Sequence, residues 1–125
     1  MPDQMVMKAA LQAYVDNINK GDAPAVIALF APDAVIEDPV GTPPKRGQEI
    51  VDWFHQAVAM KAHLTPVAPI RGSHGNAAAI AFIVQTDWEG QVTRIHSLDT
   101  CTFDDQGRIT ELKGYWGLDD VDGCA

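Results

Sequence analysis

The strongest constraint on the fold is a set of long alternating segments in the second half of the chain. From Ile95 to Phe103, inward and outward positions alternate with period two, as expected for a strand with one buried face. The short sequences at 88–90 and 104–107 combine acidic residues with Gly and are typical of hairpin turns. We therefore predict mostly antiparallel strands over residues 67–70, 77–88, 91–103 and 108–118.

The first half of the chain shows helical spacing instead. Apolar residues from Met7 to Ile18 recur at offsets of four, seven, eight and eleven, which places them on one face of a helix that ends before Gly21. Asp22 can cap a second, short helix that reaches Pro32. A brief strand and a third helix follow, over residues 34–38 and 48–60.

The order of these elements indicates an α+β fold. Helices come first and antiparallel strands follow, and 125 residues with 46% hydrophobic content fit one domain over residues 1–125. We expect three N-terminal helices packed in a strongly curved sheet that is mixed but mainly antiparallel. Such a sheet forms a cone with a deep apolar pocket.

Charge and cysteine content narrow the choice of partners and compartment. Seventeen acidic and nine basic residues give a formal net charge of -8, which would repel nucleic acid and anionic membranes, so neither is an expected partner. No apolar stretch approaches a membrane span, and the first residues lack the pattern of an export leader. Cys101 lies on a predicted core strand and Cys124 in an acidic tail that we expect to be frayed. This is poor geometry for a disulfide and favours the cytoplasm.

Several common kinds of site are missing from the sequence. The four histidines have no zinc-like spacing with Cys101; they are His55, His63, His74 and His96. The chain contains no Gly-x-Ser-x-Gly and no glycine pattern of the phosphate-loop or dinucleotide type. We therefore expect no metal and no cofactor.

Three polar side chains fall on otherwise apolar faces. Tyr14 lies within the apolar stripe of the first helix, Asp38 ends the strand at 34–38, and Asp99 shares the buried face of the alternating strand. Each alone has an ordinary structural role: a core tyrosine with its hydroxyl at the surface, a turn residue before Pro39, and a buried Asp held by backbone amides. The alternative for Asp99 is that burial raises its pKa, so that the neutral acid donates a hydrogen bond.

Apolar residues on the inward faces are candidates for the wall of a binding pocket. Phe82 and Val84 share one inward row, and the even positions from Leu112 to Leu118 share a face of the last strand. Phe82 can be interpreted as plain core, whereas a buried indole of Trp116 needs a polar partner, which a pocket carboxylate would supply. The candidate substrate-binding residues are Val40, Phe54, Phe82, Val84, Leu112 and Trp116.

Three stretches of the chain resemble bacterial ketosteroid isomerases. They cover residues 14–22, 28–41 and 98–109, so the resemblance extends over nearly the whole chain. The most specific part is Ile-Glu-Asp-Pro-Val-Gly at 36–41, because related cone folds often lack this Asp. The resemblance implies a small apolar steroid as substrate and a homodimer formed through the outer face of the sheet.

The resemblance also implies roles for the three inward polar residues. In this family one base moves a proton from carbon four to carbon six of a 3-ketosteroid, which shifts the double bond from the 5 to the 4 position without a cofactor. Asp38 matches that base. Tyr14 and a neutral Asp99 match the two donors that form the oxyanion hole for the dienolate oxygen.

The chain departs from the family pattern beside the catalytic tyrosine. The family commonly has a supporting tyrosine at the position of His55, and a further one at the position of Phe30. His55 can donate to the Tyr14 oxygen and would titrate near neutrality; alternatively it is a half-exposed helix residue. With Trp116, it is a candidate supporting residue of the site.

The cone fold alone does not determine the function, because it also hosts limonene-type epoxide hydrolases, polyketide cyclases and non-catalytic binding modules for small apolar ligands. An epoxide hydrolase of this type would use an inward Arg between two carboxylates, but Arg94 has the opposite parity to Asp99, and Arg71 lies near a Gly-rich turn. A polyketide-cyclase-like enzyme would share one Asp and needs no paired donors. A binding module needs none of the three polar residues.

Overall fold

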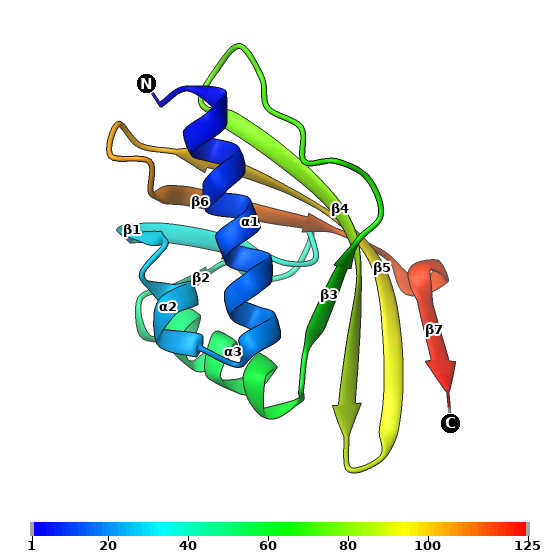
Figure 1. The fold of residues 1–125 in the computed structure, drawn as a ribbon. Helices are drawn as coiled ribbons and strands as arrows, with labels where there is room; N and C mark the ends of the chain where they lie inside the picture. The colour runs from blue at the N-terminus through cyan, green and yellow to red at the C-terminus, as the bar shows by residue number, and fades with distance from the viewer. Residues whose placement is uncertain (1, 125) are drawn as a thin grey trace.

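The molecule consists of a curved, open sheet with three helices on its concave side (Figure 1). The computed structural model describes residues 2–124. Its helices are α1 (Gln4–Lys20), α2 (Ala23–Ile27) and α3 (Gln48–Ala59), with a 3-10 helix η1 (Leu118–Asp120) near the C-terminus. The strands are β1 (Phe30–Glu37), β2 (Lys45–Arg46), β3 (His63–Pro66), β4 (Ala77–Trp88), β5 (Gln91–Phe103), β6 (Ile109–Tyr115) and β7 (Val121–Cys124).

The sheet is mixed and mainly antiparallel, as predicted. Its strand order is β2-β1-β6-β5-β4-β3, and β1 runs parallel to β6 while the other strand pairs are antiparallel. β5 pairs with β4 over residues 91–102; its other edge pairs with β6 over 98–103 and with β7 over 92–95. The α+β prediction is confirmed, and the sheet does not close on itself.

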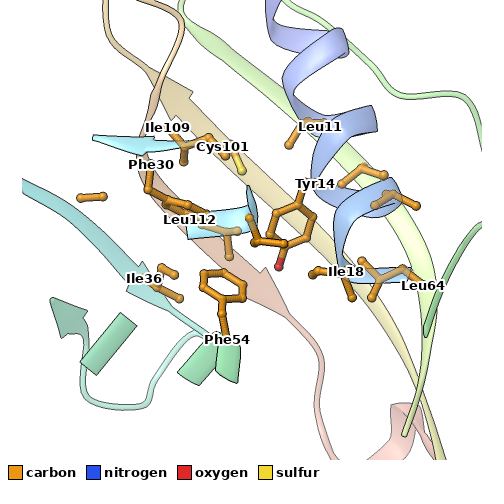
Figure 2. Packing of buried hydrophobic residues seen from close by; sticks show 14 of the residues in the cluster. Leu11, Tyr14, Ile18, Phe30, Ile36, Phe54, Leu64, Cys101, Ile109 and Leu112 are labelled. Atoms are coloured by element: carbon orange, nitrogen blue, oxygen red, sulfur yellow. The ribbon is translucent and has the colours of Figure 1, made fainter. Parts of the chain in front are cut away.

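The apolar faces predicted for α1 and α3 pack into the core and form its helical side. Asp3 accepts a hydrogen bond from the Val6 N–H at 3.0 Å and so caps α1, and Gly21 ends the helix with a left-handed φ of 74°. Figure 2 shows the side chains of α1 facing those of the sheet. The residues that meet there include Leu11, Tyr14, Ile18, Ile36, Phe54, Cys101, Ile109 and Leu112.

Two predicted boundaries in the first half differ from the structure. The second helix ends at Ile27, and Phe30 already belongs to β1, whose pairing with β6 is irregular between Phe30 and Val35. The Ile109 N–H donates to the Leu29 carbonyl at 2.9 Å, so the chain already pairs with β6 here, and Pro32 lies in the irregular part of β1, where its missing N–H is tolerated. The short strand β2, beyond the expected loop, was not predicted.

The strand predicted at 67–70 is wrong, since the strand lies at 63–66. The side chain of Asn19 pairs with the backbone of Leu64, donating to its carbonyl at 2.9 Å and accepting from its N–H at 2.8 Å. This contact between α1 and β3 fixes the strand earlier in the chain. Pro69 further prevents regular pairing in the segment that we had expected to be extended.

The end of the chain is more ordered than predicted. β6 ends at Tyr115, so Leu118 leaves the face that it was expected to share and is 89% exposed. The expected frayed tail instead forms η1 and β7, because β5 continues past the end of β6 and leaves an edge for β7 to pair with. Asp120 accepts a hydrogen bond from the Gly117 N–H at 2.8 Å and holds the turn before β7.

Cys101 is a buried, free thiol within the core. No helix in residues 2–124 is both long enough and apolar enough to span a bilayer.

Candidate active site

A cavity of about 250 Å³ lies between the helices and the concave face of the sheet. Most of its wall is apolar, and the polar side chains that reach it are few. Its residues come from α1, α3 and β3–β5, from the connection between α3 and β3, and from the segments after β1 and β6: Tyr14, Ile18, Asp38, Trp53, Phe54, Gln56, Ala57, Met60, Ala62, Leu64, Phe82, Val84, Thr86, Ile95, Ser97, Asp99 and Trp116. The three polar residues singled out from the sequence therefore share one cavity.

Tyr14 is placed by the apolar face of α1. Its ring packs edge-on against Phe30 and Phe54, with centroids 6.4 and 5.9 Å away. Figure 2 shows its hydroxyl directed away from α1, toward the space between Phe54 and Ile18. Burial raises the pKa of Tyr14 well above its usual value, and the nearby carboxyls Asp99 and Asp38 raise it further. The phenol thus stays protonated and can donate a hydrogen bond.

Asp99 is 1% exposed and lies in the middle of β5, across from Ile80 of β4. Ser97, two residues earlier on the same face, donates a hydrogen bond to Asp99 Oδ1 at 3.3 Å. Burial raises the pKa of Asp99 well above its usual value, and the charge of Asp38 adds to this, while the Ser97 bond acts in the opposite direction. A protonated carboxyl in this position is a hydrogen-bond donor.

Asp38 follows the last residue of β1 and is less buried than Asp99. Because β1 and β6 run parallel, their C-terminal ends meet, and Trp116 just beyond β6 donates its indole N–H to Asp38 Oδ1 at 2.9 Å. Gly114 leaves room for the carboxyl, since a Cβ there would collide with it. This arrangement holds Asp38 at the cavity wall.

The pKa of Asp38 is the balance of opposing influences. Burial raises the pKa above its usual value, whereas the Trp116 hydrogen bond and the positive charge of Lys45 lower it. Lys45 also lies over the Trp53 ring, 5.1 Å from its centroid. Asp38 therefore has two groups that stabilise its carboxylate, and buried Asp99 has only the Ser97 hydroxyl.

Most of the predicted site residues meet at the cavity, but three do not. Seven line it: Tyr14, Asp38, Phe54, Phe82, Val84, Asp99 and Trp116. Leu112 is fully buried in the core behind the wall, and Val40, in the loop after Asp38, is 42% exposed. His55 is exposed on α3, and no hydrogen bond joins it to Tyr14 within residues 2–124. The structure thus does not bring His55 to Tyr14.

Sequence reasoning overlooked part of the wall, although some of the signals were present. Trp53, Gln56, Ala57 and Met60 recur at helical spacing and form the cavity face of α3. Thr86 has the same parity as Phe82 and Val84, and Ile95 and Ser97 have that of Asp99. The contribution of Lys45 depends on the pairing of β2 with β1, which the sequence did not predict. No group of three or more His, Cys, Asp or Glu within residues 2–124 is placed to hold a metal ion.

Known proteins with similar sequences include enzymes of two kinds. A "Steroid Delta-isomerase" of Nocardioides simplex is 36% identical over 115 residues, covering 92% of this chain and 93% of that protein. An "Epoxide hydrolase LasB" of Streptomyces lasalocidi is 27% identical over 96% of this chain, but the match covers only 44% of that protein. The steroid isomerase is thus matched along almost its full length.

Comparison with solved structures finds the same fold. The epoxide hydrolase/cyclase-like enzyme SalBIII, described in connection with pyran ring formation in the polyether salinomycin, superposes with a TM-score of 0.91 at 25% identity. The superposition covers 99% of this chain and all of the SalBIII chain. The family model for the SnoaL-like domain matches residues 11–112. The chain therefore belongs to the SnoaL-like domain family, and within it is a relative of a steroid Delta-isomerase.

Proposed function

We propose that the protein is a steroid delta-isomerase that moves a double bond of a 3-ketosteroid from the 5 to the 4 position. The observation that carries the proposal is the difference between two carboxyls on one apolar cavity. Asp38 has an indole N–H and a lysine nearby to stabilise its charge, whereas Asp99 is 1% exposed and favours the neutral acid. The relative of 36% identity bears the name of this activity.

In the proposed mechanism Asp38 removes a proton from carbon four. The electrons of the broken C–H bond move into the ring system, and the negative charge of the resulting dienolate gathers on the ketone oxygen. Asp38 then returns the same proton to carbon six, which leaves the conjugated enone and restores the carboxylate. Because the proton is returned, the reaction needs no oxidant, reductant or cofactor.

Tyr14 and protonated Asp99 stabilise the dienolate oxygen in this proposal. Both side chains line the cavity; the raised pKa of Tyr14 keeps the phenol protonated at neutral pH, and the raised pKa of Asp99 favours its neutral acid. A hydrogen-bond donor placed where negative charge develops stabilises that charge more strongly in an apolar site than in water. The apolar wall also limits exchange of the transferred proton with solvent.

An epoxide hydrolase or cyclase is the second candidate, favoured by the match to LasB and by the TM-score of 0.91 to SalBIII. An epoxide hydrolase of the type considered in the sequence analysis would need an inward Arg between two carboxylates. In the structure Arg94 donates to Gln85, and Arg71 donates to the Pro69 carbonyl, and neither lines the cavity. The isomerase accounts better for a cavity that Tyr14, Asp38 and Asp99 all line, because its reaction uses one base and two donors.

The experiment that tests the proposal is an ultraviolet assay with a 5-ene-3-ketosteroid. The product is a conjugated enone whose absorbance the substrate lacks, so turnover is measured directly. We expect turnover by the wild-type protein. If it opens epoxides of polyether precursors and leaves the steroid unchanged, the second candidate replaces the first.

We also propose a homodimer formed through the outer face of the sheet. Leu98 and Tyr115 face each other across β5 and β6 and are 43% and 45% exposed. Burying such an apolar pair against a second copy would be favourable. Sedimentation should give the mass of a dimer, and Leu98→Glu should shift the measured mass toward that of the monomer; a monomeric wild-type protein would contradict the proposal.

We further propose that the protein is located in the cytoplasm, as expected from the positions of its two cysteines in the sequence.

A further inference from the structure

We infer that Gln56 and Thr86 form a subsite that binds a neutral oxygen substituent at the end of the substrate remote from the reacting ketone. This inference deepens the isomerase proposal and rests on it for the class of ligand. Two observations support the subsite: the positions of the two side chains in the cavity, and their unused hydrogen-bonding capacity.

Thr86 lies far from the donors along the inward row of β4. In the β4–β5 pairing, Ile80 is opposite Asp99, while Thr86 is opposite Thr93 near the hairpin turn. Thr86 is six positions after Ile80, which corresponds to about 20 Å along an extended strand. Phe82, Val84 and Thr86 all line the cavity, so it extends along β4 from the donors to the threonine.

Gln56 reaches the same end of the cavity from the opposite wall. It lies on the face of α3 that also carries Met60, one turn later, at the end of the helix. The Met60 carbonyl accepts a hydrogen bond from the Asp87 N–H at 2.8 Å, which fixes the end of α3 beside the residue that follows Thr86. Gln56 is exposed, so the cavity reaches the surface here.

The two side chains have unused hydrogen-bonding capacity. Within residues 2–124, neither the Gln56 amide nor the Thr86 hydroxyl forms a side-chain hydrogen bond. Their neighbours on the wall, Met60, Val84 and Ile95, are apolar. An amide and a hydroxyl can both donate and accept, so together they suit a carbonyl or a hydroxyl oxygen.

The same surroundings argue against other groups at this end. No Lys, Arg or His of residues 2–124 lines the cavity, so a carboxylate or sulfate would lack a countercharge. A long alkyl tail would cover the amide and the hydroxyl without replacing their bonds to water, which is unfavourable. The subsite therefore favours a fused-ring ketone that carries a second, neutral oxygen over one with an apolar side chain.

The test compares two substrates that differ only in the remote oxygen, 5-androstene-3,17-dione and 5-androsten-3-one. We expect the wild type to turn over the dione with a kcat/KM higher by about 3-fold to 10-fold, mainly through KM, as for one or two modest hydrogen bonds. The double variant Gln56→Leu with Thr86→Val should bring the ratio of the two kcat/KM values close to one.

A matched control is Thr93→Val, which makes the same chemical change at the cross-strand partner of Thr86. Thr93 is outside the set of residues lining the cavity, so this variant should keep the wild-type ratio. A ratio near one in the wild type, or a ratio unchanged in the double variant, would overturn the inference.

Binding of the two 4-ene-3-ketone products separates this inference from the proposed function. We expect calorimetry on the wild type to give a lower Kd for the 17-oxo product, and equal Kd values in the double variant. If the Kd difference is present but neither 5-ene substrate is turned over, the isomerase proposal fails and the subsite stands. Equal Kd values in the wild type would overturn the subsite, whatever the turnover.

Discussion

Asp38 and Asp99 show how the surroundings of a residue set its chemistry. Both are carboxyls on one cavity, and burial raises the pKa of both. Asp38 accepts the indole N–H of Trp116 and lies near Lys45, which favours its charged form. Asp99 is almost fully buried and is influenced by the negative charge of Asp38, and both effects favour its neutral form. One residue type can therefore act as base at one position and donor at the other.

Replacing Tyr14 with Phe tests the contribution of one donor. Tyr14→Phe removes the hydroxyl and keeps the ring contacts with Phe30 and Phe54, so the fold should be retained. We expect kcat to fall by about 100-fold to 1,000-fold, the range for loss of one oxyanion-hole donor. Steroid binding should change much less. A kcat within a few-fold of the wild type would exclude Tyr14 as a donor.

How far the site could be predicted depended on whether a residue is placed by local periodicity. Asp99 and Tyr14 were found because a strand alternates and a helix repeats, so their apolar neighbours predicted their direction. His55 was assigned to the site through the family pattern alone, and it is exposed on α3. The contacts of Lys45 and Gly114 with the Asp38 region depend on which strands pair, and pairing between distant segments is not encoded in local spacing.

At the scale of elements, the parallel pairing of β1 and β6 positions the proposed base, Asp38. The two strands end side by side, so Asp38 after β1 and Trp116 after β6 come within hydrogen-bond distance, although 78 positions separate them in the chain. The Val40 N–H also donates to the Gly114 carbonyl at 2.8 Å, which holds the loop after Asp38 against β6.

Trp116→Phe tests this contact between the strand ends. The change removes the N–H that stabilises the Asp38 carboxylate, so the pKa of Asp38 should rise. The acidic limb of the kcat/KM profile, which reports the free enzyme, should then move to higher pH. The control is Trp88→Phe, whose indole lies in the β4–β5 hairpin and is 48% exposed. Identical acidic limbs in both variants would contradict the role of Trp116.

The helices and strands were predicted correctly where the hydrophobic spacing is regular. They were missed where a contact with another element determines the position of the strand. β4 and β5 follow from alternation and α1 and α3 from helical spacing. β3 is fixed by the Asn19 side chain, and β7 forms because β5 offers a free edge beyond β6. Both causes lie in other elements, so the sequences of β3 and β7 contain no strong local signal.

At the scale of the whole molecule, the buried Asp99 links function to stability. In the folded protein its pKa is raised, so the side chain stays protonated at pH values at which the unfolded chain ionises it, above about 4. The unfolded state then binds fewer protons than the native state, and the free energy of unfolding falls as the pH rises from 4 toward the folded pKa. The side chain that we propose as an oxyanion-hole donor thus destabilises the fold at neutral pH.

Urea unfolding of Asp99→Asn at several pH values tests whether Asp99 lowers the free energy of unfolding in this way. The amide does not titrate, so the variant should gain stability over the wild type as the pH rises from about 4, and the difference should shrink below that pH. The raised pKa of Asp38 is common to both proteins and largely cancels in the comparison. A difference between the two proteins that is constant with pH would show that Asp99 is not held neutral.

The central claim is that the two carboxyls have opposite roles, and the most direct measurement is kcat for Asp38→Asn beside Asp99→Asn in the enone assay. Asp38→Asn removes the base, so we expect a loss of about 100-fold to 10,000-fold with steroid binding retained. Asp99→Asn keeps an N–H donor and should lose less, and less than Asp99→Leu, which has no donor. Near-normal turnover by Asp38→Asn, or equal inactivity of Asp99→Asn and Asp99→Leu, would contradict the account.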